Sequence, residues 1–246
     1  MGLVGSPARR RRRITVIVTI HQPNFLPWLG FFAKIAQADA MVLLDTVQYH
    51  KNEWQNRNRI KGPQGAIWVT VPVGYRFPMR IDEVPVANAG WGGKAVRTLE
   101  QAYAKAPFCD EVLEGLAPLL LRGDTLLAPL AVDIVAWAME RLGIQTPLHV
   151  ASRMGAVSED PTQRLIDLTR ALGGTTYLSG PQGRDYLEPA AFDAAGVGLD
   201  FFNYRHPEYA QLHGDFVPYL SVVDLMMNCG PSSLEILLSG CDKEQV

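Results

Sequence analysis

The chain contains few cysteines, and those it has are neither paired nor clustered. Its 246 residues include Cys109, Cys229 and Cys241, which lie far apart in the sequence. An odd number of scattered cysteines argues against a disulfide framework and is typical of proteins in a reducing cytoplasm. None of the three has the spacing of a metal-binding motif. We therefore expect a cytoplasmic protein whose fold uses neither disulfides nor a structural zinc ion.

Long hydrophobic runs are also absent. No stretch reaches the ~18 apolar residues that a membrane-spanning helix needs. Arginines at positions 9–13 and an apolar run at 14–20 have the outline of a secretion signal, but the run is short and no small-residue cleavage site follows it. Residues 1–13 are therefore predicted to be a disordered basic extension, and residues 14–246 a single α/β domain that does not bind membranes.

The chain also lacks a large excess of either charge. The formal net charge is −2, and because the arginines at 9–13 contribute +5, the remainder carries −7. A mildly acidic domain is not expected to have general affinity for nucleic acid. Hydrophobic residues make up 48% of the chain, which is ample for a buried core.

The apolar segments alternate in a way that predicts a parallel sheet. Residues 14–20 are typical of a central strand, and a helix at 30–38 and a strand at 40–45 complete a βαβ unit. Further strands are expected at 146–151, 175–179 and 198–204. A helix with Asp160 in a capping box should precede the strand at 175–179. The pattern predicts an open, mainly parallel Rossmann-like α/β sheet with flanking helices.

Two segments interrupt this alternation. Residues 91–143 are helical in pattern and predict a helical insertion, with breaks at Pro107 and Gly123 and a helix that runs from an Asp124 cap to Gly143. Residues 55–61 and 66–73 look like two strands joined by a turn at 62–65. We expect these two strands to form a hairpin beside the main sheet.

One face of the predicted hairpin is basic. In an extended strand Arg57, Arg59 and Lys61 point to the same side. Such a row suits a phosphate or carboxylate, although a solvated edge strand protected by charge would have the same pattern. The surrounding run at 51–59 is rich in amides and arginines, whose fixed hydrogen-bond geometry favours a binding surface over a merely polar hairpin.

Polar loops follow three predicted strands, at residues 21–30, 45–58 and 180–186. Ligands of open parallel sheets bind outside the carboxyl ends of the strands, so all three loops are expected to border one cleft. His21 ends a buried strand and is the best acid-base candidate, although a structural role is an equal alternative. Asp45 ends the next strand and could orient His21, act as the base, or hold Mg²⁺ with a phosphate substrate.

A second candidate for phosphate binding lies near the C-terminus. Gly230, Pro231, Ser232 and Ser233 precede a predicted helix, whose first N–H groups and hydroxyls could hold a phosphate. Plain capping of the helix by serine is the alternative. Ser179 is not expected to be a nucleophile, because the glycine that a nucleophile elbow needs two residues earlier is missing.

Several motifs in the same order resemble the WbqC-like family. The resemblance spans roughly residues 16 to 238 and is carried by His21-Gln22-Pro23, Pro27-Trp28-Leu29-Gly30-Phe31-Phe32, Lys34-Ile35, Asp45, Val47-Gln48, Trp54-Gln55-Asn56-Arg57-Asn58-Arg59-Ile60, Tyr177-Leu178-Ser179-Gly180 and Leu220-Ser221-Val222-Val223-Asp224.

The family is associated with gene clusters for O-antigen, other polysaccharides and natural products. The resemblance implies transfer of a glycyl or other small acyl group to an amino sugar or related acceptor. The substrates would be a sugar, a nucleotide-sugar or an activated amino acid, with aminoacyl-tRNA or a carrier protein as the donor. A nucleotide-dependent nucleotidyltransferase or ligase, and a non-catalytic binding protein of a biosynthetic cluster, are the alternatives.

The loops and the resemblance together predict the site residues. His21 and Asp45 are the catalytic candidates, and no residue is assigned to a resident metal. The predicted substrate-binding residues are Gln22, Asn24, Trp28, Gln48, Lys51, Trp54, Asn56, Arg57, Asn58, Arg59, Ser179, Gly180, Arg184, Tyr186 and Ser232.

Overall fold

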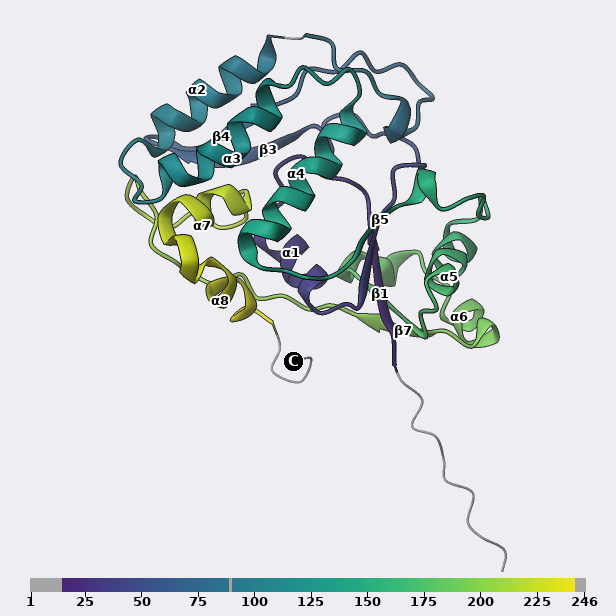
Figure 1. Cartoon of the computed structure of the whole chain (residues 1–246). Coiled ribbons are helices and arrows are strands. Elements are labelled where there is room, and N and C mark those ends of the chain that lie inside the picture. Colours follow the sequence, from purple (N-terminus) through teal and green to yellow (C-terminus); the bar gives the residue numbers. More distant parts are fainter. Residues whose placement is uncertain (1–14, 89, 242–246) are drawn as a thin grey trace, which may run out of the picture.

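The computed structural model describes residues 15–88 and 90–241, and its core is a five-stranded parallel sheet. In spatial order the strands are β5 (Leu148–Val150), β2 (Ala40–Leu43), β1 (Ile17–His21), β6 (Thr176–Ser179) and β7 (Gly198–Phe201). The predicted class, an open parallel α/β sheet with flanking helices and a helical insertion, is confirmed (Figure 1). The predicted basic extension at 1–13 lies outside the described residues.

The strand order contains a reversal at the centre of the sheet. From β1 the chain moves outward through β2 to β5, and it then crosses to the other side of β1 to form β6 and β7. In open α/β sheets such a switch point leaves a crevice at the carboxyl ends of the two central strands. Here that crevice lies beyond His21 of β1 and Ser179 of β6.

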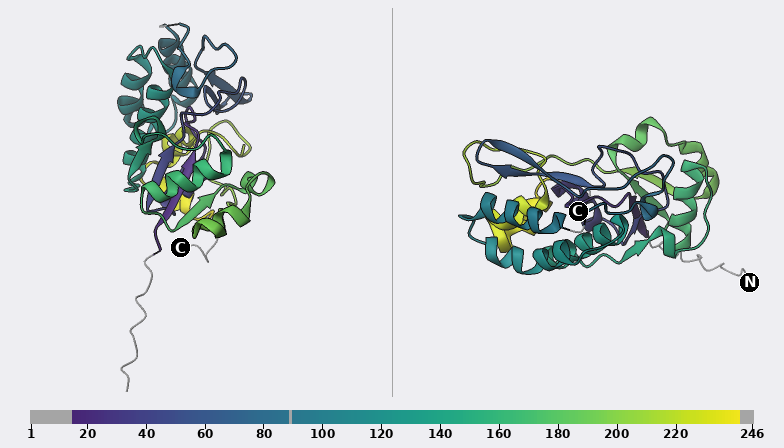
Figure 2. Two further views of the ribbon diagram at one scale, coloured as in Figure 1. Left: turned by 90° about the vertical axis from the view of Figure 1, so that its right-hand side faces the viewer. Right: turned by 90° about the horizontal axis from the view of Figure 1, so that it is seen from above.

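Each face of the sheet is covered by its own apolar layer. Met41 and Leu43 of β2 belong to a core with α1 (Leu29–Ala36) and α4 (Leu127–Leu142). Ala40 and Val42 belong to a second core with α5 (Pro161–Ala171) and α6 (Pro189–Ala195). This alternation explains why the strands read as continuous apolar runs, since both faces are buried. Figure 2 shows the helices on the two sides.

The predicted helical insertion is present as α2 (Trp91–Tyr103), α3 (Cys109–Leu121) and α4. Its helices are interrupted around Pro107 and Gly123, as predicted, and α4 ends at Gly143, which has a left-handed φ of 75°. The prediction that Asp124 caps α4 is wrong. Asp124 binds Arg122 instead, and residue 126 is held extended by a bridge to Pro85, so the helix begins only at Leu127.

The predicted hairpin is formed by β3 (Arg57–Gly62) and β4 (Gly65–Thr70), which make a separate two-stranded sheet. The turn sets a register in which Arg59 lies opposite Trp68. Arg57 and Arg59 are partly exposed on one face. Lys61 is buried, and its Nζ donates to the Gly214 carbonyl at 3.1 Å, so it does not extend the exposed basic row.

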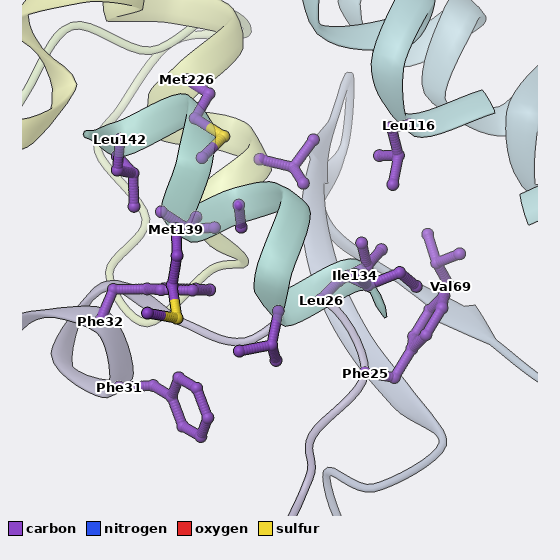
Figure 3. Close-up of a cluster of buried hydrophobic side chains, with 14 of the residues drawn as sticks. Phe25, Leu26, Phe31, Phe32, Val69, Leu116, Ile134, Met139, Leu142 and Met226 are labelled. Atoms are coloured by element: carbon purple, nitrogen blue, oxygen red, sulfur yellow. The ribbon is translucent and has the colours of Figure 1, made fainter. Parts of the chain in front are cut away.

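The larger core joins this hairpin to the insertion and to the loop that follows β1. Figure 3 shows Phe25 and Leu26 of that loop among side chains from α1, β4, α3, α4 and α7 (Val222–Cys229). The apolar segment at 222–229 is helical. The remaining short elements are η1 (Ile81–Glu83), η2 (Ala151–Arg153), η3 (Pro181–Asp185), η4 (Gly230–Ser232) and α8 (Ser233–Leu238). Within the described residues, every helix is too short or too polar to cross a bilayer.

Two adjacent glycines of α2 provide a test of the packing between α2 and α3. A Cβ on Gly92 would lie 1.9 Å from the Leu120 carbonyl oxygen, whereas a Cβ on Gly93 would meet nothing nearer than an Arg97 nitrogen at 3.8 Å. We expect Gly92→Ala to lower the free energy of unfolding by about 2 kcal/mol or more through overpacking. Gly93→Ala should be neutral or stabilising by up to about 1 kcal/mol. Chemical denaturation of both variants checks this, and equal stabilities would contradict it.

Candidate functional site

A pocket of about 780 Å³ opens at the switch point, beyond the carboxyl ends of β1 and β6. It is bordered by the loops that follow these strands, by the segment before the hairpin, by β3 and by the segment before α7. The lining residues are His21, Gln22, Asn24, Trp28, His50, Glu53, Trp54, Gln55, Asn58, Arg59, Gly180, Pro181, Gln182 and Tyr219.

The loop after β1 is fixed by hydrogen bonds from distant segments. The Phe25 amide donates to the Trp54 carbonyl at 3.0 Å, and the Asn58 side chain donates to the Leu26 carbonyl at 2.7 Å. The Val222 amide, which begins α7, donates to the Pro27 carbonyl at 2.8 Å. Because irregular buried backbone must be paired, these contacts attach the hairpin and α7 to the end of β1. They place the walls of the pocket around His21.

His21 is half-buried and held in one orientation at the base of the pocket. Its Nδ1 lies 2.9 Å from the Gln22 carbonyl oxygen, which can only accept, so Nδ1 carries the proton and Nε2 is the acceptor. Burial, and next the positive charge of Lys34, lower the pKa of His21 from 6.5 to about 3, although the bond to Gln22 opposes this. The ring is therefore neutral at physiological pH. It can accept a hydrogen bond but is a weak base.

Lys34 of α1 is buried beneath this histidine and has no carboxylate partner among residues 15–88 and 90–241. Its Nζ donates to the Ile20 carbonyl at 3.3 Å. Loss of hydration lowers the pKa of Lys34 from 10.5 to about 7, because the charged form is disfavoured in an apolar surrounding. The site thus contains a buried amine that is easily deprotonated.

Side-chain amides form a second polar layer. Gln55 Nε2 donates to Gln22 Oε1 at 2.6 Å, and Gln55 Oε1 accepts from the His50 amide at 3.1 Å. Since Gln55 is buried, this chain of bonds fixes the Gln22 side chain beside His21. These amides therefore present oriented donors and acceptors beside His21, and Glu53 is the one carboxylate among the described lining residues.

Two arginines and two tryptophans form a second side of the pocket. Trp54 and Arg59 line the pocket, and Trp68 and Arg57 extend this surface along the hairpin. The Trp54 and Trp68 rings lie 5.5 Å apart at an interplanar angle of 32°. The Arg57 guanidinium is 4.3 Å from the centre of the Trp68 ring, and that of Arg59 is 5.9 Å from both rings. Within the described residues, neither arginine forms an ion pair. We call these four residues the Trp–Arg ladder.

A third wall is aromatic. Trp28 contacts Tyr219, with ring centres 5.6 Å apart, and stacks on His206 at 6.2 Å. A Cβ on Gly30 would lie 2.2 Å from the Trp28 indole, so glycine is needed for this ring to pack over the start of α1. The site consequently combines ring-binding surfaces, amides and cations, which suits a polar ligand containing rings and an anionic group.

The structure brings eight of the predicted site residues into the pocket lining. They are His21, Gln22, Asn24, Trp28, Trp54, Asn58, Arg59 and Gly180. Residues from all three loops therefore border one cleft, as expected, except that Arg184 and Tyr186 of the third loop lie outside it. Arg184 stacks on Phe201 at 4.1 Å, and Tyr186 is exposed.

Asp45 is not part of the pocket lining. Its carboxylate is buried and accepts hydrogen bonds from the amide of Ser152 at 2.9 Å and from its hydroxyl at 2.6 Å. His21 bonds the Gln22 carbonyl instead, so the expected orientation of His21 by Asp45 is not observed. The reason is that η2 follows β5 directly and brings Ser152 to the end of β2.

Other predicted residues support the site from behind. The Gln48 amide group donates to the carbonyls of Tyr49 and Met79, and Asn56 accepts from the Tyr49 hydroxyl and donates to the Val71 carbonyl. These amides hold the segment between β2 and the hairpin.

The remaining predicted residues lie outside the lining for different reasons. Ser179 is buried and donates to the Gly180 carbonyl, whereas Lys51 is exposed. Ser232 lies in η4 between α7 and α8, away from the pocket lining, and α8 is a helix of only six residues. The expected phosphate cradle is therefore not joined to this cleft.

Several lining residues were not predicted, namely His50, Glu53, Gln55, Pro181, Gln182 and Tyr219. Gln55 lies inside the polar run and could have been chosen with its neighbours. Trp68 could have been found from the turn at 62–65, because that turn fixes Arg59 opposite Trp68. Tyr219 and the buried Lys34 have no such local signal.

Among residues 15–88 and 90–241, no three His, Cys, Asp or Glu side chains are grouped as metal ligands. Both oxygens of Asp45 bind Ser152, which is a poor arrangement for a single-carboxylate Mg²⁺ site. The groups that could bind a nucleotide are those of the Trp–Arg ladder, where guanidiniums lie next to exposed aromatic rings.

The chain matches the WbqC-like protein family over residues 22–236, a range that covers the hairpin, the insertion and every strand of the sheet except β1. The chain belongs to the WbqC-like family. It is also similar to the uncharacterized protein Rv1507c of Mycobacterium tuberculosis, with 36% identity over 224 residues, 89% of this chain and 96% of the relative. No solved structure matches the chain.

The buried amine gives a pH-dependent prediction. The pKa of Lys34 is lower in the folded than in the unfolded chain, so stability is lost as pH falls from about 10.5 through about 7. Lys34→Met keeps the volume and removes the charge. We expect this variant to have a higher melting temperature at pH 7. Its free energy of unfolding should rise by at most a few kcal/mol, at about 1.4 kcal/mol per pKa unit. The difference between variant and wild type should shrink towards pH 10. Melting curves that differ equally at pH 7 and pH 10 would contradict this assignment.

Proposed function

We propose that this protein is a small-molecule transferase, which moves a glycyl or other small acyl group onto an amino sugar or related acceptor. The observation that supports this most directly is the pocket at the sheet's switch point, where a neutral histidine faces a wall containing an unpaired arginine. The association of the WbqC-like family with polysaccharide and natural-product clusters agrees with such a substrate class.

His21 would act on the acceptor amine. Its Nε2 lone pair accepts an N–H hydrogen bond and orients the amine for attack, a role that suits a neutral imidazole with a low pKa. As the amide bond forms between the acceptor nitrogen and the donor carbonyl carbon, the ester or thioester bond of the donor breaks. The proton released by the nitrogen passes through Nε2 to the departing oxygen or sulfur atom.

Other lining groups would position the substrates. Arg59 suits a phosphate or carboxylate, and Gln22 and Asn24 offer hydrogen bonds to hydroxyl or amide groups. Trp28 and Tyr219 suit the apolar face of a sugar ring. Asp45 would support the site through Ser152 and η2 and would not transfer a proton itself.

Of the alternatives, a nucleotide-dependent ligase would hold a nucleotide phosphate with the segment at 230–233 and the arginines. Of these residues only Arg59 lines the pocket, so a phosphate there would be bound without Ser232. A non-catalytic binding protein would use the same surface but would not need an oriented imidazole acceptor at its base.

The reaction can be tested with a defined panel of substrates. UDP-glucosamine and a UDP-linked 4-amino sugar serve as acceptors, with glycyl-tRNA and a glycyl thioester as donors, and mass spectrometry detects the gain of one glycyl group. We expect His21→Ala to fold normally and to reduce turnover by about 100-fold or more, because general acid-base residues typically contribute this much.

The matched control is His149→Gln, since His149 lies on β5 outside the pocket lining. This variant should retain full turnover. Near-normal turnover in His21→Ala would remove His21 from the mechanism. If no donor and acceptor pair gives product, while the sugars bind the wild-type chain in a His21-dependent manner, the binding-protein alternative would replace the transferase.

A further inference from the structure

The Trp–Arg ladder extends beyond the pocket onto the open face of the hairpin. Trp54 and Arg59 line the pocket, whereas Trp68 and Arg57 lie next to them outside the lining. Trp54 is 40% and Trp68 47% exposed, so both rings keep a large part of their surface open to solvent. Two adjacent tryptophans with this exposure form a continuous aromatic surface that leads into the pocket.

This surface is not explained by the packing of the hairpin. The hairpin's other face already carries the buried Asn58, Ile60 and Val69, so the Trp–Arg ladder is not needed for the core. Leaving large aromatic rings in water has a free-energy cost that a ligand would remove. The exposed position of both rings therefore indicates a binding surface.

Within the described residues, the two arginines of the Trp–Arg ladder have neutral hydrogen-bond partners and no ion-pair partner. Arg57 donates to the Asn52 carbonyl and Arg59 to the Tyr219 carbonyl at 3.5 Å, so each guanidinium keeps its full charge near a neutral acceptor. The Nε atoms of both arginines are buried without a hydrogen-bond partner within the described part of the chain. Two guanidiniums on one strand face, neither of them paired with a carboxylate of the described residues, match the negative charge of linked phosphates.

We propose that the Trp–Arg ladder binds the nucleoside diphosphate part of a nucleotide-linked substrate. The base stacks on the exposed surface of Trp68 and Trp54, and Arg57 and Arg59 bind the phosphates. A sugar alone would use the rings but not two cations, and a phosphate alone would not use two exposed tryptophans. The group attached to the diphosphate then enters the pocket towards His21, because Trp54 and Arg59 belong to both regions.

This inference deepens the proposed function and rests on it for the identity of the pocket. In this arrangement the nucleotide is attached to the acceptor sugar and not to the acyl donor. Stacking is tolerant of base identity because every base has an aromatic face. We therefore expect the surface to bind different nucleoside diphosphates with similar affinity.

Isothermal titration calorimetry of the full chain with UDP, ADP and pyrophosphate tests the proposal. UDP and ADP should bind more tightly than pyrophosphate. Trp68→Leu should weaken UDP and ADP binding about 5- to 150-fold, the range expected for loss of one stacked base, and leave pyrophosphate binding unchanged. Trp68→Phe should restore most of the affinity, and Arg57→Gln should weaken all three ligands.

The matched control is Arg97→Gln, which removes an exposed arginine from α2 on a surface outside the ladder and should change no affinity. Circular dichroism melting confirms that each variant is folded. Equal affinity for UDP and pyrophosphate, unchanged UDP binding by Trp68→Leu, or no binding of any of the three at millimolar concentration would overturn the proposal. Loss of nucleotide binding with intact His21-dependent transfer would refute this inference alone, whereas nucleotide binding without transfer would refute the proposed function alone.

Discussion

The structure depends on how the irregular segment after β1 satisfies its buried backbone groups. Residues 23–27 are buried, yet they belong to neither helix nor strand. The Phe25 amide is paired by the Trp54 carbonyl, the Leu26 carbonyl by the Asn58 side chain, and the Pro27 carbonyl by the first amide of α7. An unpaired buried peptide group would cost about 1–3 kcal/mol, so the hairpin and α7 cannot separate from the sheet without a large loss of stability. The walls of the pocket are thus a consequence of backbone pairing.

This requirement also separates two kinds of polar residue that look alike in the sequence. Within the run before and along β3, Asn56 and Asn58 point inwards and pair with backbone, whereas Arg57 and Arg59 point outwards over tryptophan rings. The two-residue period of a strand produces the alternation. Buried amides therefore hold the loop in place, and the exposed cations between them remain available to a ligand.

The fold and half of the site could be predicted because their signals are local. The β-branched runs, the turn at 62–65 and the Gly143 stop each act within a few residues, and they correctly gave the sheet, the hairpin and the end of α4. The Asp124 cap was wrong because a strand-like bridge to Pro85 delays α4. The Asp45–Ser152 contact, and the place of Tyr219 in the pocket, join segments far apart in the chain, and no local pattern indicates such pairings.

The charge of a bound anion would change the pKa values of the two bases near the pocket, His21 and Lys34. Burial disfavours positive charge on both His21 and Lys34, and the charge of Lys34 lowers the pKa of His21 further. A phosphate or carboxylate that enters the pocket would oppose both effects, because a nearby negative charge stabilises the protonated forms. Binding of an anion would therefore raise the pKa of His21 and make its imidazole a stronger base.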